Sequence, residues 1–117
     1  PGVSAWWNSV SEDDLWLSAL VLGEIRKGLE LVRDRDEFKA EALEKWLDEV
    51  ISSFGDRVIP IDTAIAEEWG RMTAIRSVSV IDTLLAATAK VHGLTFVTRN
   101  VADVAELNVD VLNPFDA

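Results

Sequence analysis

The sequence contains no cysteine and only one histidine, His92. Without cysteine, the chain can form neither a disulfide framework nor a thiolate metal site. The usual zinc sites need more ligands than a single histidine supplies, and His92 ends an apolar segment, where a capping role explains it best. These two absences exclude the common cysteine- and histidine-based sites.

The sequence also lacks a long uninterrupted apolar run. A membrane-spanning helix needs about 20 predominantly apolar residues, and Glu24, Asp82 and Lys90 interrupt the most apolar segments. We find no signal-peptide pattern, no P-loop, no dinucleotide-binding glycine fingerprint and no G-x-S-x-G motif. We therefore expect a cytoplasmic protein without a membrane span and without these nucleotide-binding or serine-hydrolase sites.

Basic residues are scarce: 11 Lys and Arg stand against 21 Asp and Glu, which gives a net charge of −10. Affinity for nucleic acids depends mainly on the neutralisation of phosphates by Lys and Arg. This balance therefore argues against a basic polynucleotide-binding surface. A cluster of acids that holds a divalent cation would reverse the local potential, so a metal-dependent nuclease stays open.

Apolar residues are plentiful, because 49% of the 117 residues are hydrophobic, and this excludes a disordered chain. Their periodicity predicts alternating helices and strands in one domain over residues 1–117. The expected helices cover 3–10, 19–32, 36–53, 63–76 and 80–92, and the expected strands 15–18, 57–61, 94–98 and 109–112. Continuously apolar strands indicate a buried parallel sheet, hence a three-layer α/β/α sandwich with a central, mostly parallel sheet.

Five tryptophans are many for a chain of this length. Core packing or a subunit interface explains them best; they are Trp6, Trp7, Trp16, Trp46 and Trp69.

Asp82 is the one acid near the start of the apolar helix expected at 80–92. A charged side chain is rarely buried without a partner or a metal, because desolvation is costly. The segment Ser79-Val-Ile-Asp82 fits a capping box, in which the fourth residue reaches back to the N–H of the cap. The residues alone leave capping and chemistry equally open for Asp82.

Glu24 and Asp103 are also expected near the carboxyl ends of strands, where ligands bind in open α/β sheets. Glu24 has Gly28 one turn further along its helix, which leaves room beside the carboxylate, although a simple helical preference explains it as well. Asp103 follows the strand at 94–98 and is close in sequence to Thr98 and Asn100; helix capping by Asn100 is its alternative explanation.

Three carboxylates that converge without basic partners repel one another unless a divalent cation neutralises them. Oxygen ligands suit Mg²⁺ or Mn²⁺. Such a site orients a water molecule and stabilises in-line displacement at a phosphodiester. Together the three acids therefore predict a metal-dependent phosphodiesterase more strongly than any of them does alone.

Three segments resemble one known family: LWLSALVLGEIRKGLE, VIDTLLAATAKVHGLTFVTRNVADV and VLNPF. They are similar to the VapC-like toxins of the PIN-domain family, and the likeness covers nearly the whole chain in the same order. The resemblance implies a Mg²⁺- or Mn²⁺-dependent endoribonuclease of a type II toxin–antitoxin system. It also implies an RNA substrate, a homodimer and a cognate VapB-like antitoxin that inserts into the active-site groove.

By motif, the resemblance assigns catalysis and metal binding to Glu24, Asp82 and Asp103. It gives Thr98, Asn100 and Ser18 substrate-binding or supporting roles. The family pattern also includes an N-terminal strand that ends in Asp-x-Asn, whose Asp is a principal metal ligand. This sequence starts at Pro1-Gly2 without that strand, so we expect the strand and its acid to be missing from it.

The missing acid and the net charge of −10 keep a second hypothesis open. The chain would then be a degenerate PIN-like module that binds an antitoxin or a twin subunit without cutting RNA. Its acidic groove would receive a basic partner segment, and its tryptophans would serve interfaces.

Overall fold

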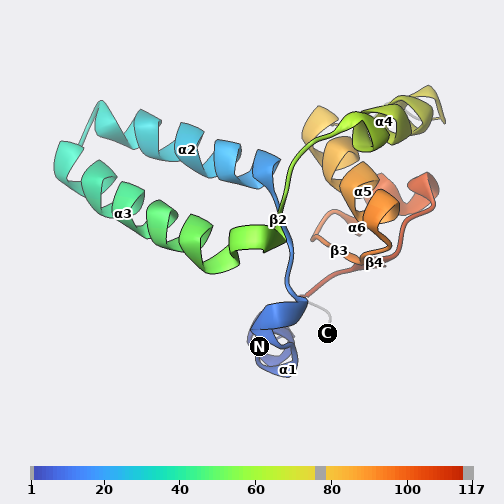
Figure 1. Ribbon diagram of the computed structural model, residues 1–117, viewed down its shortest axis with the longest axis horizontal. Coiled ribbons are helices and arrows are strands. Elements are labelled where there is room, and N and C mark those ends of the chain that lie inside the picture. Colours follow the sequence, from blue (N-terminus) through green and yellow to red (C-terminus); the bar gives the residue numbers. More distant parts are fainter. Residues whose placement is uncertain (1, 76–78, 115–117) are drawn as a thin grey trace. The chain divides into compact units, whose positions relative to one another are not determined.

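The computed structural model describes residues 2–75 and 79–114 (Figure 1). Within these residues the helices are α1 (Gly2–Ser9), α2 (Ala19–Arg33), α3 (Glu37–Phe54), α4 (Thr63–Ile75), α5 (Val80–His92) and α6 (Val101–Val104). The strands are β1 (Leu17–Ser18), β2 (Val58–Ile59), β3 (Phe96–Val97) and β4 (Val111–Leu112). Three short 3-10 helices cover Glu12–Asp14, Gly55–Arg57 and Ala105–Leu107. None of the described helices is long and apolar enough to cross a membrane.

These elements form two compact units, which we call the hairpin unit and the α4–α5 unit. The hairpin unit is Trp16–Pro60 and holds β1, α2, α3 and β2. The α4–α5 unit holds the other described residues. Each unit has its own pair of parallel strands, β1 with β2 and β3 with β4. The predicted parallel pairing is therefore confirmed, in two sheets of two strands each.

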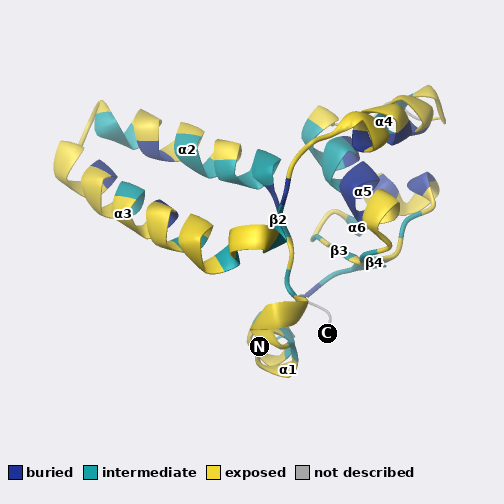
Figure 2. Ribbon diagram, in the orientation of Figure 1, coloured by how far each residue is buried: buried dark blue, intermediate teal, exposed yellow. Residues whose placement is uncertain are grey.

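In the hairpin unit, α2 and α3 pack side by side as an antiparallel pair (Figure 1). Asp36 begins α3, because its carboxylate Oδ1 accepts a hydrogen bond from the backbone N–H of Lys39 at 3.0 Å. The buried positions of both helices lie on the sides that face each other (Figure 2). Leu29 of α2 and Ala40 and Leu47 of α3 are 2%, 0% and 1% exposed. The predicted apolar periodicity of both helices thus produces a shared core.

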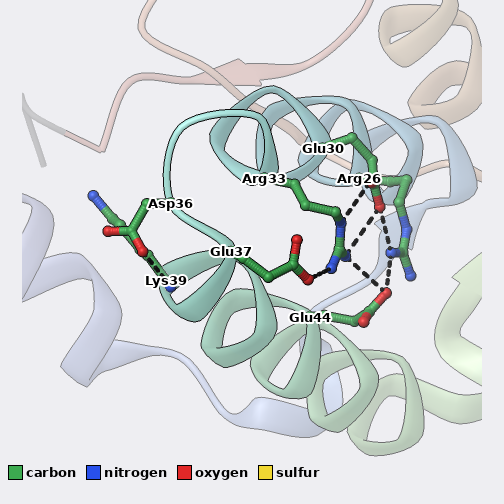
Figure 3. Close-up of polar contacts among 7 residues, drawn as sticks. All are labelled: Arg26, Glu30, Arg33, Asp36, Glu37, Lys39 and Glu44. Carbon is green, nitrogen blue, oxygen red and sulfur yellow. Dashed lines mark hydrogen bonds and ion pairs between the residues drawn. The ribbon is translucent and has the colours of Figure 1, made fainter.

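Ion pairs also connect α2 to α3 (Figure 3). Arg33 contacts Glu30 and Glu37 at 2.8 Å each and Glu44 at 3.3 Å. Arg26 contacts Glu44 at 2.5 Å and Glu30 at 3.1 Å. Hydrogen bonds from Arg33 and Arg26 lower the pKa of Glu30, and one from Arg26 lowers that of Glu44. Because these side chains are partly exposed, water and salt screen the pairs, which orient the helices more than they stabilise them.

In the α4–α5 unit, α4 packs against α5 over small side chains. Ala86, Ala87 and Ala89 of α5 are buried, as are Ile65 and Met72 of α4. Alanines let the two helices approach closely, so the larger side chains of α4 can fill the space between them. The prediction that the helix at 80–92 runs through buried surroundings is confirmed.

The ends of α4 and α5 follow the predicted chemistry. Asp62 Oδ1 accepts a hydrogen bond from the N–H of Ile65 at 3.0 Å and so caps the start of α4. Gly93 ends α5 with φ 65°, a left-handed conformation that glycine adopts without the steric penalty of a side chain. Among the described α-helices, α6 is the one that was not predicted, because its single turn is too short to show an apolar periodicity.

The tryptophans differ from the core-packing prediction. Trp7, Trp16 and Trp46 are 59%, 47% and 49% exposed, and Trp6 and Trp69 are half-buried. No tryptophan therefore belongs to the described core, and the interface alternative stays a prediction.

Glu68 of α4 is the one buried acid among the described residues, at 8% exposure. Its carboxylate pairs with Lys90 Nζ of α5 at 3.1 Å and with Arg71 Nη2 at 3.1 Å. Burial acts to raise the pKa of Glu68, but the hydrogen bonds from Lys90 and Arg71 outweigh it and lower the pKa overall. The charged form is therefore favoured in the folded state, where it joins α4 to α5.

We expect Glu68→Gln to lower the free energy of unfolding by about 1–2 kcal/mol at neutral pH, because the two basic partners lose their carboxylate. The folded-state pKa of Glu68 is lowered, so its contribution exists above the unfolded pKa and disappears as the pH falls through the folded pKa. Urea denaturation across the acid range should therefore show a shallower pH dependence for the variant. Glu67→Gln, at an exposed neighbour, is the control. Equal unfolding midpoints for the two variants would contradict the role of Glu68.

Candidate active site

The start of α5 is held by three hydrogen bonds to one residue, Ser79. Its hydroxyl Oγ accepts from the backbone N–H of Asp82 at 3.4 Å, a long bond that places Ser79 as the N-cap. Its carbonyl accepts from the N–H of Thr83 at 3.0 Å and from the hydroxyl of Thr83 at 2.7 Å. The cap therefore depends on the side chains of both Ser79 and Thr83. Thr83 was not among the predicted residues, although its spacing of four residues from Ser79 is what a hydroxyl-to-carbonyl bond in a helix requires.

The Asp82 carboxylate takes no part in this cap. A capping box would also have the Asp82 side chain accept from the N–H of Ser79, and that bond is absent from the described residues. The same described residues provide the Asp82 side chain with no other hydrogen-bond or ion-pair partner. Asp82 is half-buried at the positive end of the helix dipole, which favours a negative charge. Capping is thus assigned to Ser79, and the Asp82 carboxylate is available to bind something else.

Thr98 and Asn100 follow the end of β3 in the same unit. The N–H of Thr98 donates to the carbonyl of Leu112 at 2.9 Å and so continues the β3–β4 pairing. The hydroxyl of Thr98 accepts from the N–H of Asn100 at 3.1 Å, which turns the chain into α6. Asn100 is the N-cap of α6 by position, but its side chain makes no capping bond. The Asn100 side chain is exposed at the carboxyl end of a parallel strand.

Asp103 lies in the single turn of α6. Its N–H donates to the carbonyl of Asn100 at 3.1 Å, and its side chain is exposed. Helix α6 packs against α5, as does β3. Asp103 is therefore presented on an element that contacts the helix of Asp82.

The strand that follows α5 packs against it. Gly93 ends α5, and both β3 and α6 contact that helix. Thr98 and Asn100 lie in the sequence between these two elements, and Asp82 is in the first turn of α5.

Glu24 and Ser18 belong to the hairpin unit. Glu24 is exposed on α2, and a side chain added at Gly28 would meet no atom within 4 Å, so the space that we expected at that glycine is open. Ser18 is 7% exposed, and its hydroxyl accepts from the N–H of Leu20 at 3.1 Å. This bond makes Ser18 the N-cap of α2. Ser18 thus has a structural role, and its predicted part in substrate binding stays a prediction.

The donors at these positions fit a hard cation in kind. Carboxylate, hydroxyl and amide oxygens are the ligands that Mg²⁺ and Mn²⁺ prefer. In number the set is incomplete, because no group of three or more acids or histidines that could hold a metal ion occurs among residues 2–75 and 79–114. In the α4–α5 unit alone, Asp82 and Asp103 supply two carboxylates.

Residues 3–106 match the family described as the PIN domain, and this match spans both units. The chain belongs to the PIN domain family. The resemblance that we inferred from the segments around Glu24 and Asp82 is therefore confirmed, and the α/β fold with small parallel sheets is a PIN fold.

Two named proteins and one solved structure illustrate the relatives of this PIN protein. It is 29% identical to Toxin FitB from Neisseria gonorrhoeae over 97% of this chain and 84% of that protein. It is 28% identical to VapC ribonuclease Y4jK from Sinorhizobium fredii, with the same two shares covered. The crystal structure of FitAcB from Neisseria gonorrhoeae superposes with a TM-score of 0.89 and 30% identity, over 99% of this chain and 86% of that one.

The division of roles at the start of α5 predicts different stability effects for two neighbouring residues. Ser79→Ala should lower the free energy of unfolding by about 1–2 kcal/mol, because it removes the cap. Asp82→Asn should change it by no more than about 0.5 kcal/mol, because only a helix-dipole interaction is lost. Chemical denaturation of both variants beside the unmodified protein measures this. A larger loss for Asp82→Asn than for Ser79→Ala would mean that Asp82 caps the helix after all.

Proposed function

We propose that this PIN protein is the toxin of a VapBC-type toxin–antitoxin system and acts as a Mg²⁺- or Mn²⁺-dependent endoribonuclease. The observation that carries the proposal is the Asp82 carboxylate, which has no partner among residues 2–75 and 79–114 and is half-buried in the first turn of α5 beside a cap that does not need it. The names of the relatives, Toxin FitB and VapC ribonuclease Y4jK, support the toxin and ribonuclease parts. Cytoplasmic action on RNA follows from this proposal.

Glu24, Asp82 and Asp103 are the proposed metal ligands. A bound Mg²⁺ would lower the pKa of a water molecule and offset phosphate charge. Asp82 and Asp103 of the α4–α5 unit would bind the ion through their carboxylates, and the positive end of α5 favours the negative charge of Asp82. Thr98, Asn100 and Ser18 would hold or support the RNA backbone at the strand ends.

The fold proposal is that both units belong to one PIN domain, in which the two strand pairs are parts of a single central, mostly parallel sheet. The single family match over residues 3–106 supports one domain, because it includes residues of both units. The helices would then cover both faces of the sheet in a three-layer α/β/α sandwich.

The proposed partners are a cognate VapB-like antitoxin, an RNA substrate and a second copy of the chain. The net charge of −10 suits a basic segment of an antitoxin. One solved relative is FitAB bound to a DNA fragment, and this likeness supports an antitoxin partner. The exposed tryptophans Trp7, Trp16 and Trp46 are available for such contacts.

Asp82→Asn in the full-length protein should abolish Mg²⁺-dependent cleavage of RNA and relieve growth arrest on expression, because the ion loses a ligand while the fold keeps its cap. Asp103→Asn and Glu24→Gln should reduce cleavage by about 100-fold or more. Cleavage of a labelled RNA with and without Mg²⁺ measures this, and Asp110→Asn, at an exposed acid of the α4–α5 unit, is the control.

Undiminished cleavage by Asp82→Asn would refute the catalytic assignment. If the unmodified full-length protein bound its antitoxin but never cleaved RNA, with or without Mg²⁺, the degenerate binding module would be the better description.

A further inference from the structure

The side of α2 that faces away from α3 is largely exposed. Leu29, the buried residue of α2, lies on the side toward α3, and the 3.6-residue period of a helix places Leu20, Glu24, Lys27 and Leu31 on the opposite side. Glu24 and Lys27 are exposed and make no hydrogen bond or ion pair within residues 2–75 and 79–114. Leu31 is 60% exposed, and Leu20 is half-buried. We call this side the outer face of α2; it consists of Leu20, Gly23, Glu24, Lys27, Gly28 and Leu31.

The outer face has nearly the same order of residue types in both directions along the helix. The order is Leu, Gly, Glu, Lys, Gly, Leu, and the midpoint lies between Ile25 and Arg26. Each leucine and each glycine has an identical residue at the same distance on the other side of the midpoint, whereas Glu24 has Lys27, a residue of opposite charge. Such a surface is complementary to itself when two copies meet about a two-fold axis.

We propose that the outer face of α2 is an interface between two copies of this chain, in which the two α2 helices lie antiparallel about a two-fold axis through their midpoints. Glu24 of each copy then pairs with Lys27 of the other, and Leu20 of each packs against Leu31 of the other. This inference deepens the proposed function and rests on the part of it that includes a second copy of the chain as a partner.

The charges select both the occupant and its orientation. Two parallel helices would place Glu24 opposite Glu24 and Lys27 opposite Lys27, and like charges that meet across an interface repel each other. The antiparallel arrangement gives two attractive pairs instead. Each copy supplies one acid and one base, so the two copies satisfy each other without a third component.

The two glycines leave room for this contact. A Cβ added at Gly23 or at Gly28 would meet no atom within 4 Å, and short side chains at a helix contact allow the two axes to approach. From Leu20 to Leu31 the helix rises about 17 Å, so the contact between two such faces is small. Small interfaces belong to weak, reversible complexes, and we expect a dimer that dissociates in the micromolar range.

Charge reversal of the two central residues in the full-length protein tests the interface. Glu24→Lys leaves two lysines on the outer face and Lys27→Glu leaves two glutamates, so two copies of either variant repel each other. An equimolar mixture of the two variants restores both attractive pairs, because each lysine again lies opposite a glutamate. Lys45→Glu, at an exposed lysine of α3, is the control. Sedimentation equilibrium over a range of concentrations gives the dissociation constant of each dimer.

We expect each of the two outer-face variants to weaken dimerisation by about tenfold or more. The mixture should recover the affinity of the unmodified protein, and Lys45→Glu should dimerise as the unmodified protein does. Recovery in the mixture can come only from contacts between chains, because the charges within each variant chain still repel each other.

Three results would overturn the inference. If both outer-face variants dimerise as tightly as the unmodified protein, the second copy binds another face and only the interface is refuted. If the mixture does not recover, or if Lys45→Glu weakens the dimer equally, the effect is one of net charge. If the unmodified protein is monomeric at every concentration, the inference fails together with the proposed homodimer. The ribonuclease part of the proposed function is tested separately, by RNA cleavage with Asp82→Asn.

Discussion

Helix α5 must be buried along most of its length and still carry a charged residue in its first turn. The two requirements conflict, because a carboxylate that is buried without a partner destabilises the fold. The sequence resolves the conflict along the helix axis. Its buried positions, Thr83 and residues 86–89, are threonines and alanines, whereas Asp82 stays half-buried. The candidate site therefore lies at the start of α5, where the helix is less buried than in its middle.

Glu68 of α4 and Asp82 of α5 differ in whether their carboxylates have partners. Glu68 is buried and fully engaged by Lys90 and Arg71, so its charge serves packing. Asp82 has no such partner among the described residues, and a serine performs the capping that its own side chain offers. Glu68 thus contributes to the packing of the fold, whereas the Asp82 side chain does not. This contrast favours a ligand for Asp82.

Helix positions followed from the sequence because the apolar periodicity of α2, α3 and α5 is strong and their caps are of standard types: Ser18, Asp36, Ser79 and Gly93. The choice between capping and chemistry at Asp82 did not follow, because Ser-x-x-Asp fits both and only the orientation of the side chain separates them. The exposure of Trp7 and Trp46 was also beyond the sequence, since an aromatic residue in an apolar pattern suits a core and an interface equally. For the candidate site, the sequence placed Asp82, Thr98, Asn100 and Asp103 on adjoining elements. Ser18, to which we had given a substrate-binding or supporting role, is instead the N-cap of α2.

The α2–α3 pair has a consequence for the order of folding. Its helices are joined by a three-residue turn at 34–36, and ion pairs such as Arg33 with Glu37 connect residues close in sequence. The parallel pairing of Leu17 with Val58, in contrast, can form only after the intervening chain has been ordered. Because closing a short loop loses less entropy than closing a long one, the helical pair would assemble first and bring β1 and β2 together. Once α2 and α3 have packed, the chain between the two strands is already ordered. The pairing of β1 with β2 then no longer requires the closure of a long flexible loop.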